Sequence, residues 1–428
     1  MRLGGRIAAA SEVLADMAAR KRPVADALRD WGLSHRFAGS GDRAAIGNLV
    51  YDALRKKLSL SWRVSDDAPL PLVAAVLLDS WNETPASLAA KLEGDRFAPQ
   101  LPPLNLLEAF GVADLSKAPD HVQADIPEWT APHLKAMFGD DFIAECQAQT
   151  GRPPVDMRVN RLLSTRNNVI ADLPKDIGVA ASKLVEDGLR IPAGACDYRQ
   201  PNIQAEPAFQ KGWFEIQDEG SQLVANLSGA APGETVLDYC AGGGGKTLAL
   251  ASIMANKGQI FATDSDKVRL APIFDRLKRA ETRNVQVKAA KSDLSELESA
   301  MDMVLIDAPC TGAGTWRRRP DAKWRLSSAQ LETRMKEQSA ILQSAKTYVK
   351  PGGRIVYITC SLFREENEAQ IAAFLAGNSG FSAMSGSDLA KRGGFDESLF
   401  LSGETGLTLT PRRTGTDGFF LSVLHKTA

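Results

Sequence analysis

The chain has 428 residues, of which 44% are apolar and 24% are charged, a composition typical of a folded protein with roughly two or three domains. No apolar run approaches the roughly 18 residues of a membrane span, and the first residues lack the apolar core of a signal peptide. We therefore expect a cytoplasmic protein with no membrane partner. The net charge of −1 gives no global sign of nucleic-acid binding, so any polyanion contact must come from local patches.

The cysteines and histidines do not form a metal site in the sequence. The five cysteines are widely scattered, no pair has zinc-knuckle or redox-motif spacing, and the four histidines supply no cluster. We interpret Cys146 and Cys196 as reduced core residues.

Residues 1 to about 95 are predicted to be helical, because apolar residues recur at helical spacing over 7–17 and 46–54. Basic residues accompany this pattern: Arg20, Lys21, Arg22, Arg29, His35, Arg36, Arg43, Arg55, Lys56 and Lys57. Such a run is either a solvated helix face or an RNA-binding surface.

A proline-containing connection leads to a mixed segment, with a helix expected over 131–150 and a strand over 155–160. After Trp213, strands and helices alternate. Strands are expected at 235–238, 259–263, 285–287, 303–306, 354–359 and 418–424, and helices at 248–254 and 328–349, with a turn at 351–353. This alternation predicts a parallel, doubly wound sheet.

A glycine-rich loop follows the first of these strands: Cys240, Ala241, Gly242, Gly243, Gly244, Gly245 and Lys246. Glycines before a helix allow backbone amides to approach a ligand beside the positive helix end. A P-loop is excluded because Cys240 occupies its first glycine position. A dinucleotide site fits loosely, and the nucleoside site of a class I methyltransferase remains.

Two carboxylates favour a nucleoside ligand. Asp264 ends the second strand, where it can bind the ribose hydroxyls of NAD or of S-adenosylmethionine. Asp293, after the third strand, would suit the adenine amino group.

Two cysteines follow neighbouring strands, Cys310 in the sequence Asp307-Ala308-Pro309-Cys310 and Cys360 after Thr359. Ligands of open α/β sheets lie beyond the carboxyl ends of the strands, so both thiols should face the cofactor.

Methylation at C5 of a pyrimidine requires this set of groups. A thiolate that adds at C6 makes C5 nucleophilic, and a carboxylic acid near N3 stabilises the charge that develops. The nucleophile's pKa must fall, and we expect the basic residues of 317–325 to lower it and to attract phosphate, with Trp316 and Trp324 stacking on bases.

The motifs together resemble the Fmu/Sun (Nop/Sun) family of RNA cytosine-C5 methyltransferases. The family's C-A-x-P-G-G-K-T is matched from Cys240, with Gly243 in place of proline, which should loosen the loop. The family's D-A-P-C-[ST]-G motif starts at Asp307, T-C-S-x-x-x-x-E-N-E at Thr359 and D-G-F-F at Asp417; a weaker match covers 214–221.

The resemblance implies a Rossmann-like class I methyltransferase domain over 213–428, a small α+β bridging domain over 123–212 and an all-helical NusB-like RNA-binding domain over 1–122. It assigns Cys360 as nucleophile and Cys310 as the group that aids product release. Asp307 would contact cytosine and lie near the methyl donor, with Asp264 and Asp293 on the nucleoside of S-adenosylmethionine.

The expected substrate is RNA, with 16S rRNA first and tRNA second, and the protein is expected to act as a monomer. Two alternatives remain open. One is a non-catalytic RNA-binding assembly factor on a methyltransferase scaffold, which would need neither thiol. The other is a DNA cytosine methyltransferase, in which the Pro-Cys thiol at Cys310 would be the nucleophile.

Overall fold

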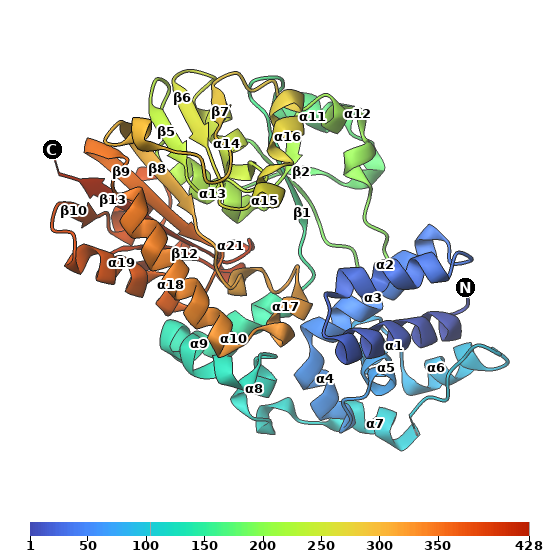
Figure 1. The fold of residues 1–428 in the computed structure, drawn as a ribbon. Helices are drawn as coiled ribbons and strands as arrows, with labels where there is room; N and C mark the ends of the chain where they lie inside the picture. The colour runs from blue at the N-terminus through green and yellow to red at the C-terminus, as the bar shows by residue number, and fades with distance from the viewer. Residues whose placement is uncertain (103, 428) are drawn as a thin grey trace. The chain divides into compact units, whose positions relative to one another are not determined.

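The chain, described over residues 1–102 and 104–427 by a computed structural model, divides into two units (Figure 1). The helical unit comprises Met1–Pro153, Ala193–Pro201 and Trp316–Leu326. The sheet unit comprises Pro154–Pro192, Asn202–Thr315 and Ser327–Ala428. Across the described residues, we find no helix with both the length and the apolar character needed to cross a bilayer.

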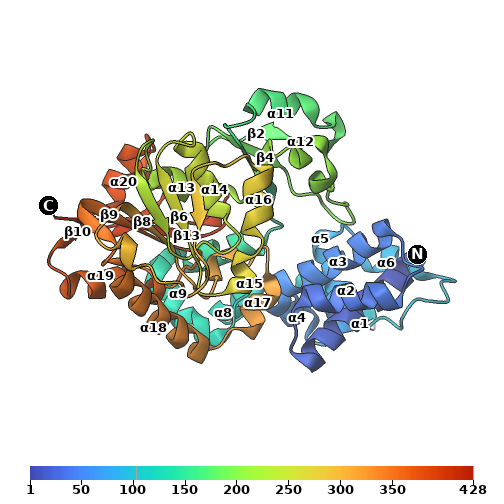
Figure 2. The ribbon, with the colours of Figure 1, turned by 45° about the horizontal axis from the view of Figure 1, so that its top comes forward.

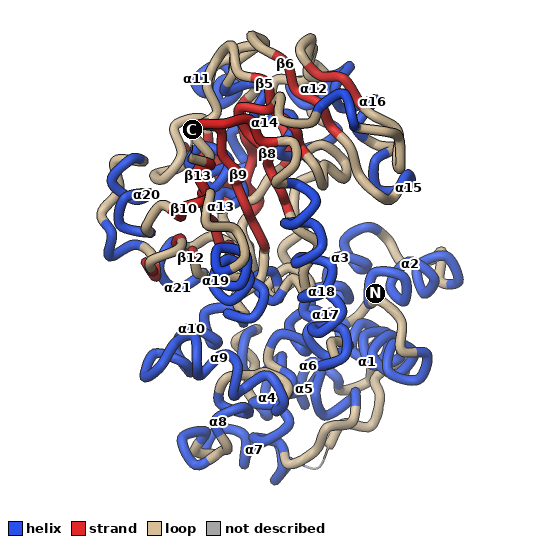
Figure 3. Tube along the Cα trace, turned by 60° about the vertical axis from the view of Figure 1, so that its left-hand side comes forward, coloured by secondary structure: helices blue, strands red, loops and turns tan. Residues whose placement is uncertain are grey.

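The helical unit is built of helices and loops alone over its described residues (Figure 3). Its α-helices are α1 (Leu3–Arg20), α2 (Val24–Ser34), α3 (Ser40–Arg55), α4 (Lys57–Val64), α5 (Pro69–Ser80), α6 (Pro85–Leu92), α7 (Leu104–Val112), α8 (Asp120–Gln123), α9 (Ala131–Phe138), α10 (Phe142–Gln147) and α17 (Pro320–Arg325). Ile7, Leu49 and Leu77 from α1, α3 and α5 meet in one core. The periodicity of the first 95 residues therefore predicted their structure correctly.

The single helix expected over 131–150 is wrong. Gly139 adopts a positive φ of 54° and ends α9, and α10 begins at Phe142. A glycine permits this backbone reversal without a Cβ clash, so the apolar spacing continues across a break in the helix.

The sheet unit contains a small antiparallel sheet in the order β2-β3-β1-β4. Its elements are β1 (Val155–Val159), α11 (Arg166–Asp172), β2 (Ala180–Ala181), β3 (Gly188–Ile191), α12 (Pro207–Gln210) and β4 (Phe214–Ile216). Met157 and Phe214 are fully buried in the core of this sheet, and Figure 2 shows α11 and α12 beside it. The strand expected at 155–160 is β1.

The larger sheet has the order β11-β12-β13-β9-β8-β5-β6-β7, with β10 paired to β13. Its strands are β5 (Thr235–Asp238), β6 (Gln259–Ala262), β7 (Val285–Val287), β8 (Met301–Asp307), β9 (Val349–Thr359), β10 (Phe381–Ala383), β11 (Leu401–Gly403), β12 (Gly406–Leu409) and β13 (Phe419–Lys426). The five strands from β9 to β7 are parallel, and β13 is antiparallel to β9. The expected parallel sheet is confirmed.

Alternating residues of these strands enter two separate cores. Leu305 of β8 packs with α13 and α14, whereas its neighbour Ile306 packs with α18 and α19. This follows from the two-residue period of a strand, and it explains why the central strands are apolar throughout. The helices of this part are α13 (Glu219–Leu227), α14 (Gly245–Ile253), α15 (Lys267–Leu270), α16 (Ile273–Arg279), α18 (Ser328–Ala345), α19 (Glu368–Ala376), α20 (Gly386–Arg392) and α21 (Pro411–Thr414).

The turn expected at 351–353 is instead an irregularity inside β9. Met301 pairs with Val349 and Met303 pairs with Arg354, so extra β9 residues are accommodated between the two pairs. Gly352 has a φ of 74°, which a bulge permits where a regular strand would not. The Pro-Gly-Gly sequence therefore distorts the strand without ending it.

Candidate active site

The carboxyl ends of β5, β6, β8 and β9 meet at one edge of the sheet. Asp238, the last residue of β5, pairs with Leu305 of β8, and Asp307 pairs with Ile358 of β9. Because these strands are parallel, the segments that follow them start from the same edge. The glycine-rich loop, Asp264, Asp307 and Cys360 follow these strand ends, as expected.

Two glycines of the loop need to be glycines. Gly242 has a φ of 50° and Gly244 a φ of 80°. A Cβ at Gly244 would lie 2.5 Å from Cγ1 of Ile273, closer than van der Waals contact allows. The carbonyl of Gly243 accepts a hydrogen bond of 2.6 Å from Arg276, so a specific contact holds the position where the family has proline.

Asp264 and Asp238 are both buried beside the loop. The amide of Gly242 donates to Oδ2 of Asp264 at 2.9 Å, which fixes the loop against the end of β6. Thr247 donates to Oδ2 of Asp238 at 2.6 Å, while Oδ1 of Asp238 has no hydrogen-bond partner among the described residues. Burial raises the pKa of Asp238 to about 7.

Asp293 is placed differently. It is exposed and caps a short turn, with its two carboxylate oxygens accepting from the amide and the hydroxyl of Ser295. These hydrogen bonds, the backbone one first, lower the pKa of Asp293.

The two predicted cysteines are neighbours, with Sγ of Cys310 lying 3.4 Å from Sγ of Cys360. The hydrogen bond between the thiols, followed by burial, raises the pKa of Cys310 well above its ordinary value. Cys240 is also shielded, and burial raises its pKa. A thiol held protonated is a poor nucleophile, so neither Cys310 nor Cys240 is favoured for attack.

Lys246 and Asp307 form an ion pair across the site. Nζ of Lys246 lies 2.8 Å from Oδ2 of Asp307 and 3.4 Å from Oγ of Ser221. The Lys246 side chain is almost fully buried and its ammonium lies over the Phe419 ring, at 5.3 Å from the centroid. The Asp307 side chain is 38% exposed, so the buried ammonium holds one end of the pair while the carboxylate remains accessible at the site.

Glu366 joins the two cysteine segments. It accepts hydrogen bonds from the amide of Thr311 at 2.9 Å, from the hydroxyl of Thr311 at 2.5 Å and from Gln338 at 2.9 Å. Next to it, Asn367 accepts from Thr359 at 2.6 Å and donates to the carbonyl of Ser361 at 3.0 Å. Burial raises the pKa of Glu366.

Glu366 and Asn367 belong to the T-C-S-x-x-x-x-E-N-E motif, from which no function was predicted for them. Their position in the E-N-E part of this motif was the one feature of the sequence that pointed to a role at the site. The structure shows them holding the segments after β8 and β9 in register.

Three of the residues expected to contact RNA, Trp316, Lys323 and Trp324, make contacts within the protein instead. Lys323 and Trp324 belong to the helical unit. Lys323 is buried and donates to the carbonyls of Arg55 and Asp125, and Trp324 donates to the carbonyl of Leu54 at 2.7 Å. Trp316 is also buried. Because main-chain oxygens and the helical core take up these three groups, they are not free for phosphate or bases, whereas Arg319 and Arg325 are exposed.

The loop fits the nucleoside part of S-adenosylmethionine. The orphaned oxygen of Asp238 is a hydrogen-bond acceptor without a protein donor, and a Cβ built on Gly245 would meet no atom closer than 3.9 Å. A buried acceptor without a partner is costly unless a ligand supplies the donor. The site therefore offers space and an unpaired acceptor beside the helix N-terminus.

Comparison with known proteins agrees with this geometry. Residues 227–425 match the family model of the 16S rRNA methyltransferase RsmB/F, and residues 126–198 match a ferredoxin-like domain of RsmF/B-like methyltransferases. The ribosomal RNA small subunit methyltransferase B of Enterobacter sp. (strain 638) is 34% identical over 58% of this chain and 57% of that protein. The enzyme of the same name from Sodalis glossinidius (strain morsitans) is 30% identical over 90% of both chains.

The solved structure of PH0851 is 28% identical, with a TM-score of 0.74 over 100% of this chain and 99% of that chain. These matches confirm the expected class I methyltransferase fold, the S-adenosylmethionine cofactor and methylation of RNA cytosine, in preference to a non-catalytic scaffold. The chain belongs to the RsmB/F family of 16S rRNA methyltransferases.

Proposed function

We propose that this protein methylates C5 of a cytosine in 16S rRNA, with Cys360 as the nucleophile and Cys310 as the group that assists elimination. The observation that carries the proposal is the 3.4 Å separation of the two thiols at the edge that also holds the glycine-rich loop. Addition and elimination are separate steps, and two adjacent thiols can serve one step each.

The first step is addition of the Cys360 thiolate to C6 of the base. A bond forms between Sγ and C6, the C5–C6 double bond opens, and negative charge moves toward N3. The Lys246 ammonium, paired with Asp307 at 2.8 Å, supplies a positive charge that stabilises it. When bound, S-adenosylmethionine supplies an electrophilic methyl group.

The second step regenerates the aromatic base. C5 now carries both the new methyl group and its original proton. The C5 proton passes to water, the C5–C6 double bond re-forms and the Cys360 thiolate leaves C6. Cys310, held as the thiol by its raised pKa and 3.4 Å from Cys360, donates a hydrogen bond to the departing sulfur and so assists elimination.

Further proposals concern the nucleoside, the domains and the molecular context. Asp264 and Asp293 are assigned to the nucleoside, together with Cys240, Ala241 and Gly242–Lys246 along the loop. The division into domains 1–122, 123–212 and 213–428 remains a proposal, as do a monomeric state and a cytoplasmic location.

The test measures transfer of labelled methyl groups from S-adenosylmethionine to 16S rRNA and, separately, to tRNA, followed by bisulfite sequencing of the product. We expect 5-methylcytosine in 16S rRNA alone, and none with Cys360→Ala. Label on tRNA alone would reassign the substrate, and label on another base would contradict the proposed chemistry.

A further inference from the structure

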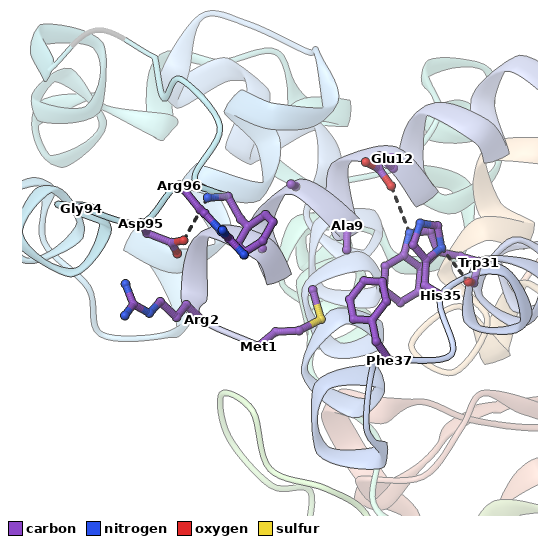
Figure 4. Close-up of a pocket in the computed structure, with 13 residues that line it drawn as sticks. Met1, Arg2, Ala9, Glu12, Trp31, His35, Phe37, Gly94, Asp95 and Arg96 are labelled. Carbon is purple, nitrogen blue, oxygen red and sulfur yellow. Dashed lines mark hydrogen bonds between the residues drawn. The ribbon is translucent and has the colours of Figure 1, made fainter.

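The helical unit contains an open cavity of about 850 Å³ (Figure 4). Gly5, Ala8 and Ala9 of α1 form its floor, and their small side chains leave the space empty. The volume is within the range of roughly 300–1,000 Å³ found for ligand sites. The floor is apolar, so what binds here must present an apolar face.

Aromatic rings line the cavity. Trp31 and His35 are stacked with centroids 4.3 Å apart and planes within 9°, and the Phe37 ring meets His35 edge-on at 5.8 Å. In Figure 4 these three rings gather on one side, with Arg96 on the other. Phe37 is 72% exposed, and Phe97, which also lines the cavity, is 60% exposed. Rings of this size that lack cover indicate an interaction site.

Hydrogen bonds hold the stacked rings in place. Nε1 of Trp31 donates to Glu12 at 3.1 Å, and Nδ1 of His35 donates to the Trp31 carbonyl at 2.9 Å. The ring faces are therefore fixed before a ligand arrives, which reduces the entropy lost on binding.

The charges at the rim favour an anionic ligand. Arg2 and Arg96 line the cavity, are exposed and have no carboxylate within ion-pair distance among the described residues. Elsewhere on α1 and α2 the arginines are paired: Arg20 with Asp16, Arg22 with Asp16 and Asp30, and Arg29 with Asp26. Arg2, just before α1, and Arg96, after α6, thus differ from these paired arginines and place positive charge at the cavity.

We propose that this cavity binds an unstacked base of single-stranded RNA, with the flanking phosphates on Arg2 and Arg96. Fixed aromatic faces with adjacent arginines are the combination that recognises splayed bases. This inference rests on the proposed function, because it takes RNA as the substrate. The cavity would be a second RNA contact, far in sequence from the catalytic motifs.

The test is fluorescence anisotropy of a labelled single-stranded RNA of mixed sequence with the full-length protein. The double variant Phe37→Ala, Phe97→Ala should bind about tenfold more weakly, the loss expected when a base loses its stacking partners. Phe37→Tyr should bind like the unmodified protein, whereas Phe37→Leu, which keeps apolar area without an aromatic face, should not. Leu33→Ala is the matched control, since Leu33 is 61% exposed on α2 and does not line the cavity.

Two further probes separate stacking from charge. A ribose-phosphate oligomer without bases should not distinguish the double variant from the unmodified protein. Arg2→Gln and Arg96→Gln should each reduce the slope of log affinity against log salt by about 0.7, and the ion-paired Arg29→Gln should leave it unchanged.

Equal affinity of the double variant and the unmodified protein for RNA would overturn the proposal, as would full RNA binding by Phe37→Leu, which would show that an aromatic face is not required. Binding requires neither Cys360 nor methyl transfer. A loss of affinity by the double variant in a protein that methylates no cytosine would support the cavity and contradict the proposed function.

Discussion

At the scale of single residues, two thiols 3.4 Å apart occupy chemically different positions. Cys310 has a raised pKa because it is hydrogen-bonded to Cys360 and buried. The family motif assigns attack to Cys360, and the geometry leaves Cys310 within reach of the same base. The order of the two roles is therefore open to a direct experiment.

We expect Cys360→Ala to form no covalent RNA complex and to transfer no methyl groups, because no thiolate reaches C6. Cys310→Ala should still add to the base and methylate it, but elimination should be slow because no neighbouring thiol donates to the departing Cys360 sulfur. It should trap a protein–RNA species visible on denaturing electrophoresis. The double variant is the control and should trap nothing. Trapping by Cys360→Ala with none by Cys310→Ala would reverse the roles.

Adjacent glycines of the loop should respond in opposite directions. Gly243 does not have a positive φ, and a Cβ there would lie 3.4 Å from Arg276, so alanine fits. Gly243→Ala should stabilise the protein by about 0.4–1 kcal/mol, because alanine lowers the conformational entropy of the unfolded chain. Gly244→Ala should destabilise it, because its Cβ would collide with Ile273 at a φ of 80°. The midpoints of urea unfolding measure both. Equal shifts for the two variants would show that the loop conformation is wrong.

At the scale of elements, one buried carboxylate connects the segments after β8 and β9. Glu366 accepts from Thr311 in one segment and lies beside Asn367, which donates to Ser361 in the other. Each cysteine follows one of these strands, so the separation of the thiols depends on a contact between segments about fifty residues apart.

We expect Glu366→Ala to lower kcat about tenfold or more, with a smaller effect on KM, because displaced thiols weaken the reaction more than binding. Glu366→Gln should keep most of the activity, since an amide can still accept from the Thr311 amide and donate to its hydroxyl. Circular dichroism controls for folding. If Gln is as damaging as Ala, the carboxylate charge matters more than the positioning of the segments.

At the scale of the whole molecule, a sequence motif is divided between two structural units. The segment that begins at Trp316 belongs to the helical unit, where Lys323 donates to the carbonyls of Arg55 and Asp125. Removing residues 1–122 would leave Lys323 without the Arg55 acceptor and expose Trp324. Truncation would therefore perturb the motif as well as RNA binding, and point variants are the cleaner test.

Lys323 should also make stability depend on pH. Burial lowers the pKa of Lys323 to about 8 from its ordinary 10.5, so between these values the unfolded chain binds more protons than the folded one. Stability must then rise with pH across that window, by up to about 3 kcal/mol. Lys323→Met should flatten the rise in urea-unfolding midpoints measured from pH 7 to pH 10, and the exposed Lys21→Met should not. An unchanged slope with Lys323→Met would exclude Lys323 as its source.

Local sequence determined the elements and the chemistry. Strand β5 and strand β7 begin and end where they are predicted, because a short apolar run and the residues that bound it are short-range properties of the sequence. The residues of the site stand at strand ends, so a parallel sheet was enough to bring them to one edge. The motifs around Cys310 and Cys360 predicted the reaction because each is a short run of consecutive residues at a strand end.

Only the tertiary structure decided which of these residues touch. The ion pair of Lys246 with Asp307 and the contact of Glu366 with Thr311 join residues more than fifty positions apart. Packing also buried Lys323 and partly buried Trp324, both of which were expected to contact RNA, and left Phe37 and Phe97 exposed. The local sequence specifies the chemical type of a side chain and the helix or strand to which it belongs. The burial of that side chain and its contact partners depend on which distant segments pack against it.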